Sequence, residues 1–192
     1  MKLIYGVGLN DLTEPTRYSK GVNTKEYNLW LQMLRRCYSE TALKRNPTYK
    51  DCYVSENWLK FAEFAKEVRE LKGFGNIDYE LDKDLIIQNN KLYSVDTVCF
   101  LPKSLNSALT LPNFKNKDLP CGVTYFDGKY WSRLSPLNHR KAHSTPEEAF
   151  EVYKEVKENY IRGMADTWKG KIDQRAYEAL ANYEFPRMFI IK

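Results

Sequence analysis

Residues 79–106 read YELDKDLIIQNNKLYSVDTVCFLPKSLN, and the interpretation of the whole chain starts from this stretch. A short strand is expected around Tyr79–Leu81 and a second around Val98–Leu101, with a polar turn at Gln88–Asn90 between them. Pro102 is typical of the first turn of a helix, where its missing N–H would have no partner. The stretch therefore predicts a strand, a loop, a strand and a helix in fewer than thirty residues.

Two amphipathic helices are expected before this stretch. The first lies in the stretch that starts at Thr24, and its apolar face consists of residues spaced by three and four: Trp30, Met33, Leu34, Cys37 and Tyr38. Arg35 and Arg36 point away from that face. The second begins after Ser55 as N-cap, ends at Lys72–Asn76 (KGFGN), and buries Trp58, Phe61, Phe64, Ala65, Val68 and Leu71. The two apolar faces are expected to pack together, and Ser39–Asp51 between them is interpreted as a loop.

A second module is expected after the linker at residues 109–120. CGVTYFD, KYWSRLS and RKAHS are typical of three short strands, with a tight turn at Asp127-Gly128 and another at Pro136–His139. Thr145 as N-cap, Pro146 at the first helical position and Glu148 as the capping-box acid predict the start of the following helix. A last helix is expected around Asp173–Ala181.

The sequence therefore predicts an α+β fold: two packing helices and a ββα unit, then a small three-stranded antiparallel sheet packed on a helix. The expected divisions are an irregular arm at 1–23, the helices and ββα unit at 24–110, the sheet module at 118–165, and a C-terminal helix and tail at 166–192.

Composition narrows the class of partner. The net charge of +5 is modest, but residues 101–143 contain seven Lys or Arg and only two Asp, which favours a polyanionic partner. The four cysteines lack a CxxC pair and sit beside apolar residues, which favours reduced, buried thiols over a three-cysteine zinc site. No signal peptide or membrane-spanning stretch is seen, so a cytoplasmic protein is expected.

Residues 79–106 resemble the ββα-metal finger of HNH endonucleases, in a branch common in bacteriophage genomes. The matching residues are Leu81, Asp82, Lys83, Asp84, Asn90, Tyr93, Ser94, Phe100 and Asn106. Downstream, CGVTYFDGKYWSRL and STPEEAFEVYKEVKENY are similar to the plant ethylene-response-factor DNA-binding domain, which phage HNH proteins often carry as a C-terminal module.

The first resemblance implies metal-dependent hydrolysis of a phosphodiester. It assigns Asp82 and Asn106 to one Mg²⁺ or Mn²⁺ ion, because both side chains offer hard oxygen donors. Asn90 would brace the loop. Lys83 stands where these enzymes usually have a general-base His, and a lysine serves as a base only when burial or a nearby metal favours its neutral amine. Tyr93 or Asp84 are the alternative groups for positioning water.

The second resemblance implies a sheet that enters the major groove of double-stranded DNA. Its candidate DNA contacts are Tyr125, Lys129, Trp131, Arg133, Arg140 and Lys141. Lys129, Trp131 and Arg133 would share one face of a strand, although Trp131 could equally form the core of the small sheet. His139 and His143 are expected at the surface.

The favoured function is thus an HNH-type DNA endonuclease acting in the cytoplasm of an infected bacterial host. Two alternatives stay open: a DNA-binding regulator that has lost catalysis on the same fold, and a phage protein that inhibits a host enzyme. Cutting both strands with one finger requires a homodimer or two successive nicks.

Overall fold

The computed structural model describes residues 3–13, 15–18, 21–111 and 118–186, and confirms the α+β class. It divides the chain into two compact units. The first consists of residues 1–103 and 171–176, and the second of residues 104–170 and 177–192. This division differs from the expected one, because the boundary falls inside the ββα stretch and part of the C-terminal segment belongs to the first unit.

The first unit contains three α-helices, two 3₁₀ turns and two two-stranded sheets in its described residues. These elements are α1 (Lys25–Tyr38), α2 (Glu40–Arg45), η1 (Pro47–Tyr49), β1 (Tyr53–Val54), η2 (Asn57–Leu59), α3 (Phe61–Glu70), β2 (Tyr79–Asp82), β3 (Leu92–Tyr93) and β4 (Cys99–Pro102). The second unit contributes α4 (Lys103–Leu109, whose first residue belongs to the first unit), β5 (Val123–Phe126), β6 (Lys129–Leu134), η3 (Ser135–Leu137), β7 (His139–His143) and α5 (Pro146–Trp168). The last helix, α6 (Gln174–Ala181), has residues in both units.

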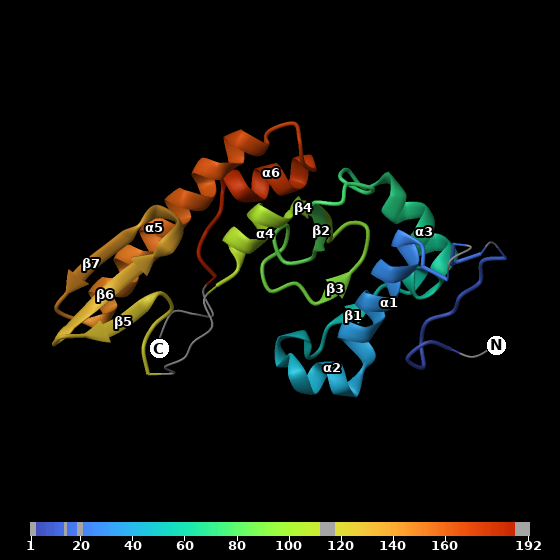
Figure 1. Ribbon diagram of the computed structural model, residues 1–192, viewed down its shortest axis with the longest axis horizontal. Helices are drawn as coiled ribbons and strands as arrows, with labels where there is room; N and C mark the ends of the chain where they lie inside the picture. Colours follow the sequence, from blue (N-terminus) through green and yellow to red (C-terminus); the bar gives the residue numbers. More distant parts are fainter. Residues whose placement is uncertain (1–2, 14, 19–20, 112–117, 187–192) are drawn as a thin grey trace. The chain divides into compact units, whose positions relative to one another are not determined.

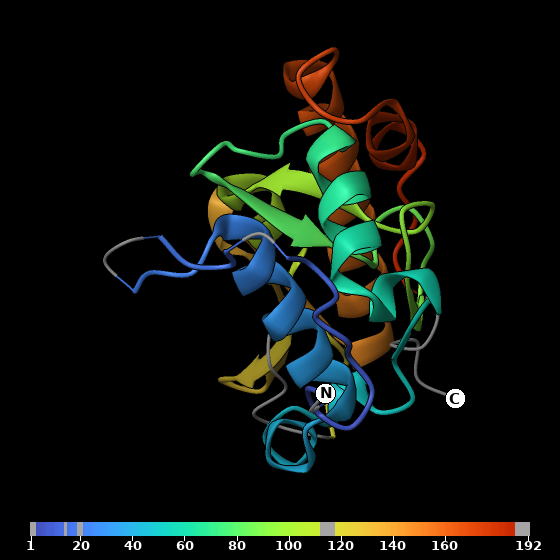
Figure 2. The ribbon, with the colours of Figure 1, turned by 90° about the vertical axis from the view of Figure 1, so that its right-hand side faces the viewer.

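Helices α1 and α3 pack side by side in the first unit (Figure 2). The expected apolar faces meet as predicted, and the residues they share in one core cluster include Trp30, Met33, Leu34, Phe61 and Phe64. Trp30 is fully buried, and its indole N–H donates to the backbone oxygen of Trp58 at 2.7 Å. The core therefore satisfies the polar atom of its largest side chain, as a buried indole requires.

Two local expectations were wrong. The second helix begins at Phe61 rather than after Ser55, because Lys60 is extended and bridges Leu9 of the N-terminal arm. Residues 57–59 form a 3₁₀ turn instead. The segment read as a loop contains the short helix α2, whose first turn is capped when Ser39 Oγ accepts from the Ala42 N–H at 3.4 Å.

The predicted ββα strands form an antiparallel pair. In β2 and β4, Leu81 lies opposite Phe100 and Asp82 opposite Cys99. Leu81 and Phe100 pack on the main core of the first unit, so by alternation Asp82 and Cys99 lie on the other face of the ribbon. The chain also forms a parallel pair, β1 with β3, that the sequence did not indicate.

The second unit contains the predicted three-stranded antiparallel sheet, in the order β5-β6-β7, with α5 along one face (Figure 1). Asp127 and Gly128 adopt φ of 53° and 72°, as a two-residue type I′ turn requires. The predicted helix start is confirmed: Thr145 Oγ1 accepts from the Glu148 N–H at 3.2 Å. Glu148 in turn accepts from the N–H of Ser144, the residue before the cap, at 3.1 Å.

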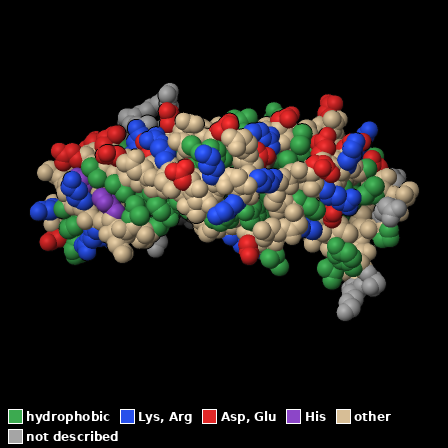
Figure 3. Space-filling model, turned by 90° about the horizontal axis from the view of Figure 1, so that it is seen from above, with side chains coloured by type: hydrophobic (Ala, Val, Ile, Leu, Met, Phe, Trp, Pro, Cys, Tyr) green, Lys and Arg blue, Asp and Glu red, His purple; other side chains and the backbone are tan. Residues whose placement is uncertain are grey.

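The thiols of the protein are buried, and its surface charge is mixed. All four cysteines are free and buried, and burial raises their pKa values, that of Cys37 to about 12. Lys and Arg side chains are interspersed with Asp and Glu over the face shown in Figure 3. Among the described helices, none is long and apolar enough to cross a membrane.

Candidate active site and nucleic-acid interface

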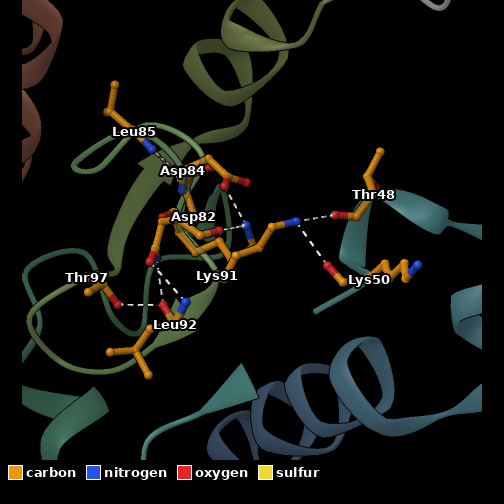
Figure 4. Close-up of polar contacts among 10 residues, drawn as sticks. Thr48, Lys50, Asp82, Asp84, Leu85, Lys91, Leu92 and Thr97 are labelled. Carbon is orange, nitrogen blue, oxygen red and sulfur yellow. Dashed lines mark hydrogen bonds and ion pairs between the residues drawn. The ribbon is translucent and has the colours of Figure 1, made fainter. Parts of the chain in front are cut away.

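Asp82 ends β2 and begins the loop toward β3 (Figure 4). Its Oδ1 accepts from two backbone N–H groups, those of Asp84 at 3.0 Å and Leu85 at 2.8 Å. Burial raises the pKa of the Asp82 carboxyl, and the nearby charge of Asp84 adds to this, while the two N–H groups act in the opposite direction. The charge of the neighbouring Lys83 also acts to lower the pKa of Asp82.

Asn90 holds the loop between β2 and β3 closed. Its side chain is 8% exposed, and its Nδ2 donates to the backbone oxygens of Lys83 at 2.8 Å and Leu92 at 2.6 Å. Its Oδ1 accepts from the Leu92 N–H at 3.0 Å. One amide thus fixes both ends of the loop, which is the bracing role that the family resemblance implies.

Lys83 is buried, and its amine is already engaged. Nζ forms an ion pair with Asp84 and donates to the backbone oxygen of Asn90 at 2.8 Å. It also lies 6.0 Å from the ring centres of Tyr49 and Tyr93. Lys83 and Asn90 therefore tie the loop in both directions, each side chain bonding to the backbone oxygen of the other residue.

Tyr93 is 1% exposed and contributes to the core rather than to an open site. Burial raises the pKa of its hydroxyl far above the ordinary value, and the Arg36 guanidinium, hydrogen-bonded to it, acts in the opposite direction. The Arg36 guanidinium also lies 5.5 Å from the ring centre of Tyr49. Arg36 was expected to point away from the helix packing, and this was wrong. Two cations, Arg36 and Lys83, flank the same pair of tyrosine rings.

Asn106 lies on α4, the helix that directly follows β4, and is half-buried. Asp82 belongs to the first unit and Asn106 to the second, so their sharing an ion stays a prediction. In the described part of the chain, no group of three or more His, Cys, Asp or Glu side chains is arranged to hold a metal ion. A three-cysteine zinc site therefore has no support among the described residues.

Arg175 makes contacts near β4 that the sequence did not reveal. Within the first unit it donates to the backbone oxygens of Val95 at 3.2 Å, Asp96 at 2.9 Å and Val98 at 3.3 Å, just before β4. The Asp173 carboxylate binds the same guanidinium through two oxygens, at 3.1 and 2.8 Å. Residues 171–176 thus fasten the turn that leads into β4, opposite Asp82.

The three-stranded sheet has a basic outer face, turned away from α5. Pairing places Trp131 opposite Thr124 and Ala142, and Arg133 opposite Arg140, while Ser132 and Leu134 are buried. Four of the six candidate DNA contacts share the outer face: Lys129, Trp131, Arg133 and Arg140. Alternation places Tyr125 and Lys141 on the opposite face. The strands carry four Lys or Arg and no Asp or Glu.

Trp131 lies on the outer face and is half-buried there, outside the core of the module. Its indole N–H donates to the backbone oxygen of Phe126 at 3.1 Å, and the Arg140 guanidinium lies 4.3 Å from its ring centre. Stacking on the ring holds the guanidinium of Arg140 in a defined orientation on the sheet.

His139 and His143 begin and end β7, and both are half-buried. Their Nε2 atoms lie 2.9 and 3.0 Å from the hydroxyl of Ser132, which is fully buried. Burial lowers the pKa of His143, and the charges of Lys141 and His139 act in the same direction against that of Glu148. Both histidines thus contact a buried hydroxyl and are only partly exposed, whereas they were expected at the surface, where they would tune DNA contacts.

No family model, curated protein or solved structure matches this chain.

Proposed function

We propose that the protein is a metal-dependent DNA endonuclease of the HNH type. The observation that carries the proposal is the β2–loop–β4 arrangement, in which Asn90 ties Lys83 to Leu92 and Asp82 ends the first strand. The helix with Asn106 follows β4 without a break. This combination supports a ββα-metal finger because local hydrogen bonds fix the residues that the resemblance assigns.

Asp82 and Asn106 would hold one Mg²⁺ or Mn²⁺ ion. The donor set fits such an ion, because a carboxylate and an amide oxygen are hard ligands. The bound ion would stabilise the phosphate and the leaving oxygen. Asp82 acts as the charged donor, and Asn90 keeps the loop in the shape that presents it.

Lys83 is the proposed group that takes a proton from the attacking water. To do so, Lys83 needs a free lone pair directed at the water, whereas its amine now pairs with the Asp84 carboxylate and donates to the Asn90 oxygen. The burial of Tyr93 and its raised pKa make that hydroxyl a weaker candidate. The engagement of Lys83 favours a second candidate function: a DNA-binding protein of the same fold that does not cut.

Double-stranded DNA is the proposed partner of the outer sheet face. Lys129, Arg133 and Arg140 are exposed there, and the strands carry no acid to oppose them. Phosphate neutralisation by such side chains releases counterions, so the affinity should fall steeply with salt.

Plasmid nicking by the full chain tests the proposal. Purified protein is incubated with supercoiled plasmid in Mg²⁺, in Mn²⁺ and in EDTA, and nicked and linear DNA are quantified. Nicking is expected in either metal and not in EDTA, and Asp82→Asn should abolish it. Glu63→Gln, which changes an exposed carboxylate on α3, is the matched control and should cut normally.

Lys83 variants then separate the two candidate functions. Lys83→Ala should remove nicking and leave DNA affinity nearly unchanged, while Lys83→His should retain or raise activity. Nicking by Lys83→Ala at the wild-type rate would show that another group activates the water. A wild-type protein that binds DNA but never nicks it with either metal would establish the non-cutting function instead.

A further inference from the structure

Phe126 exposes an aromatic ring on the basic outer face of the sheet. It is 61% exposed, ends β5, and lies opposite Lys129. Alternation places it on the same face as Trp131 and Arg133, whereas Tyr125, 57% exposed, lies on the opposite face and contacts Tyr130 at 4.9 Å between ring centres. One exposed ring does not by itself require a partner, but its place among Lys129, Arg133 and Arg140 suits a partner that offers both a flat apolar surface and negative charge.

The backbone holds Phe126 firmly in this position. Phe126 is the strand partner of Lys129 across the tight turn formed by Asp127 and Gly128. The backbone oxygen of Phe126 accepts a hydrogen bond from the indole N–H of Trp131 at 3.1 Å. A ring carried on such a fixed backbone loses little conformational entropy when it binds a partner, because only its two side-chain torsions have to be ordered.

Trp131 cannot serve the same purpose. The indole N–H, which is the one hydrogen-bond donor of the Trp131 side chain, donates to the backbone oxygen of Phe126. The Arg140 guanidinium lies 4.3 Å from the centre of the Trp131 ring and covers one side of it. Trp131 instead orients Arg140. The ring on this face that remains largely open to solvent is therefore that of Phe126.

A phenyl ring has no hydrogen-bonding group, so it cannot read the polar edges that paired bases present in the major groove. In an intact duplex its apolar contact is limited to the thymine methyl group. The face of a base becomes available where the base is unpaired, and stacking of aromatic side chains on such bases is favourable and tolerant of sequence.

We infer that the outer face binds DNA containing an unpaired base, that Phe126 stacks on this base, and that Lys129, Arg133 and Arg140 hold the flanking phosphates. The inference rests on the proposed DNA binding and specifies its substrate class, namely gapped or bulged DNA rather than intact duplex.

Binding of the full chain to two labelled DNAs tests the inference. One is a short intact duplex and the other is the same duplex with a one-nucleotide bulge, both measured by fluorescence anisotropy in EDTA so that nothing is cut. Wild-type protein should prefer the bulged DNA. Phe126→Ala should weaken binding to the bulged DNA at least about fivefold while barely changing binding to the duplex, and Phe126→Tyr should restore the preference.

Tyr125→Ala is the matched control, because it removes a neighbouring ring of similar exposure on the other face. It should leave the preference for the bulge unchanged, and circular dichroism checks that each variant is folded. 2-Aminopurine at the bulge should change its fluorescence on adding wild-type protein but not Phe126→Ala.

Two results would overturn the inference but not the proposed function. One is equal affinity of the wild-type protein for the two DNAs. The other is a Phe126→Ala substitution that weakens binding to both DNAs equally, which would indicate contact with paired bases. Arg133→Ala separates this failure from that of the proposed function. It should weaken binding to both DNAs, and a wild-type protein that binds neither DNA would remove the DNA-binding proposal and the inference together.

Discussion

Replacing Asn90 with Ala should open the loop between β2 and β3. The substitution removes three hydrogen bonds, to the Lys83 oxygen, the Leu92 oxygen and the Leu92 N–H. The Leu92 oxygen keeps a donor in Thr97 Oγ1 at 2.7 Å, so two backbone groups lose their side-chain partner. At about 1–3 kcal/mol for each unsatisfied buried group, and with water relieving part of the cost, the free energy of unfolding should fall by about 2–3 kcal/mol.

Urea unfolding followed by tryptophan fluorescence measures this loss, because Trp30 and Trp58 are fully buried in the core of the same unit. The transition should move to lower urea without a change in its slope. Asn89→Gly is the control: Asn89 is exposed and has a φ of 59°, which glycine adopts without strain. A loss below about 0.5 kcal/mol for Asn90→Ala would refute the bracing role, since that is the lower limit for a single hydrogen bond.

Three further outcomes are expected. Arg175→Ala should lower the free energy of unfolding by about 1–3 kcal/mol, because three backbone oxygens lose a charged donor, and Arg175→Lys should restore little in the same urea assay. Burial lowers the pKa of His143 below its ordinary value of 6.5, so as the pH falls the unfolded chain binds a proton at this residue before the folded chain does. The melting temperature should therefore be constant above about pH 6.5 and fall below it. His143→Asn should flatten this dependence of melting temperature on pH, measured by calorimetry between about pH 7.5 and about pH 5. Arg133→Ala should weaken DNA binding and reduce the slope of log affinity against log salt by about one, measured by anisotropy.

Much of the fold was predictable because its signals are local. The apolar periods of α1 and α3, the Asp127-Gly128 turn and the Thr145 cap each depend on residues within a few positions of one another. The start of α3 was not predictable, since Lys60 is held extended by Leu9, some fifty residues earlier. The parallel pairing of β1 with β3 has the same origin: Tyr53 meets Leu92, and no local pattern encodes that register.

The candidate site divides in the same way. Asp82 and Asn90 were named through the resemblance of residues 79–106 to the ββα-metal finger, and both belong to one short loop and bond within it. The contact of Arg36 with Tyr93 could not be predicted, because the position of Arg36 on its helix predicts a solvent-exposed side chain and only folding brings Tyr93 beside it. Arg175 was also missed, since its acceptors lie 77 to 80 positions earlier in the chain and are backbone oxygens that any sequence would provide.

The different surroundings of the Asp82 and Lys83 side chains follow from where strand β2 ends. Asp82 still lies on the ribbon face opposite the main core, and its carboxylate accepts from the N–H groups of the turn just after it. Lys83, the next residue, leaves the strand and sends its amine inward to the Asn90 oxygen and toward the ring of Tyr93.

If Lys83 is the base for an ion on Asp82, its lone pair must face out of the loop interior, and the ion pair with the Asp84 carboxylate is one of the two contacts that hold the amine in place. Asp84 is exposed, so releasing it costs little, whereas giving up the buried Asn90 oxygen costs more. Asp84→Asn should consequently raise nicking if Lys83 is the base, because it frees the amine without disturbing the Asn90 brace. If Lys83 only fastens the loop, the same variant should lower stability and leave the nicking of the folded protein unchanged.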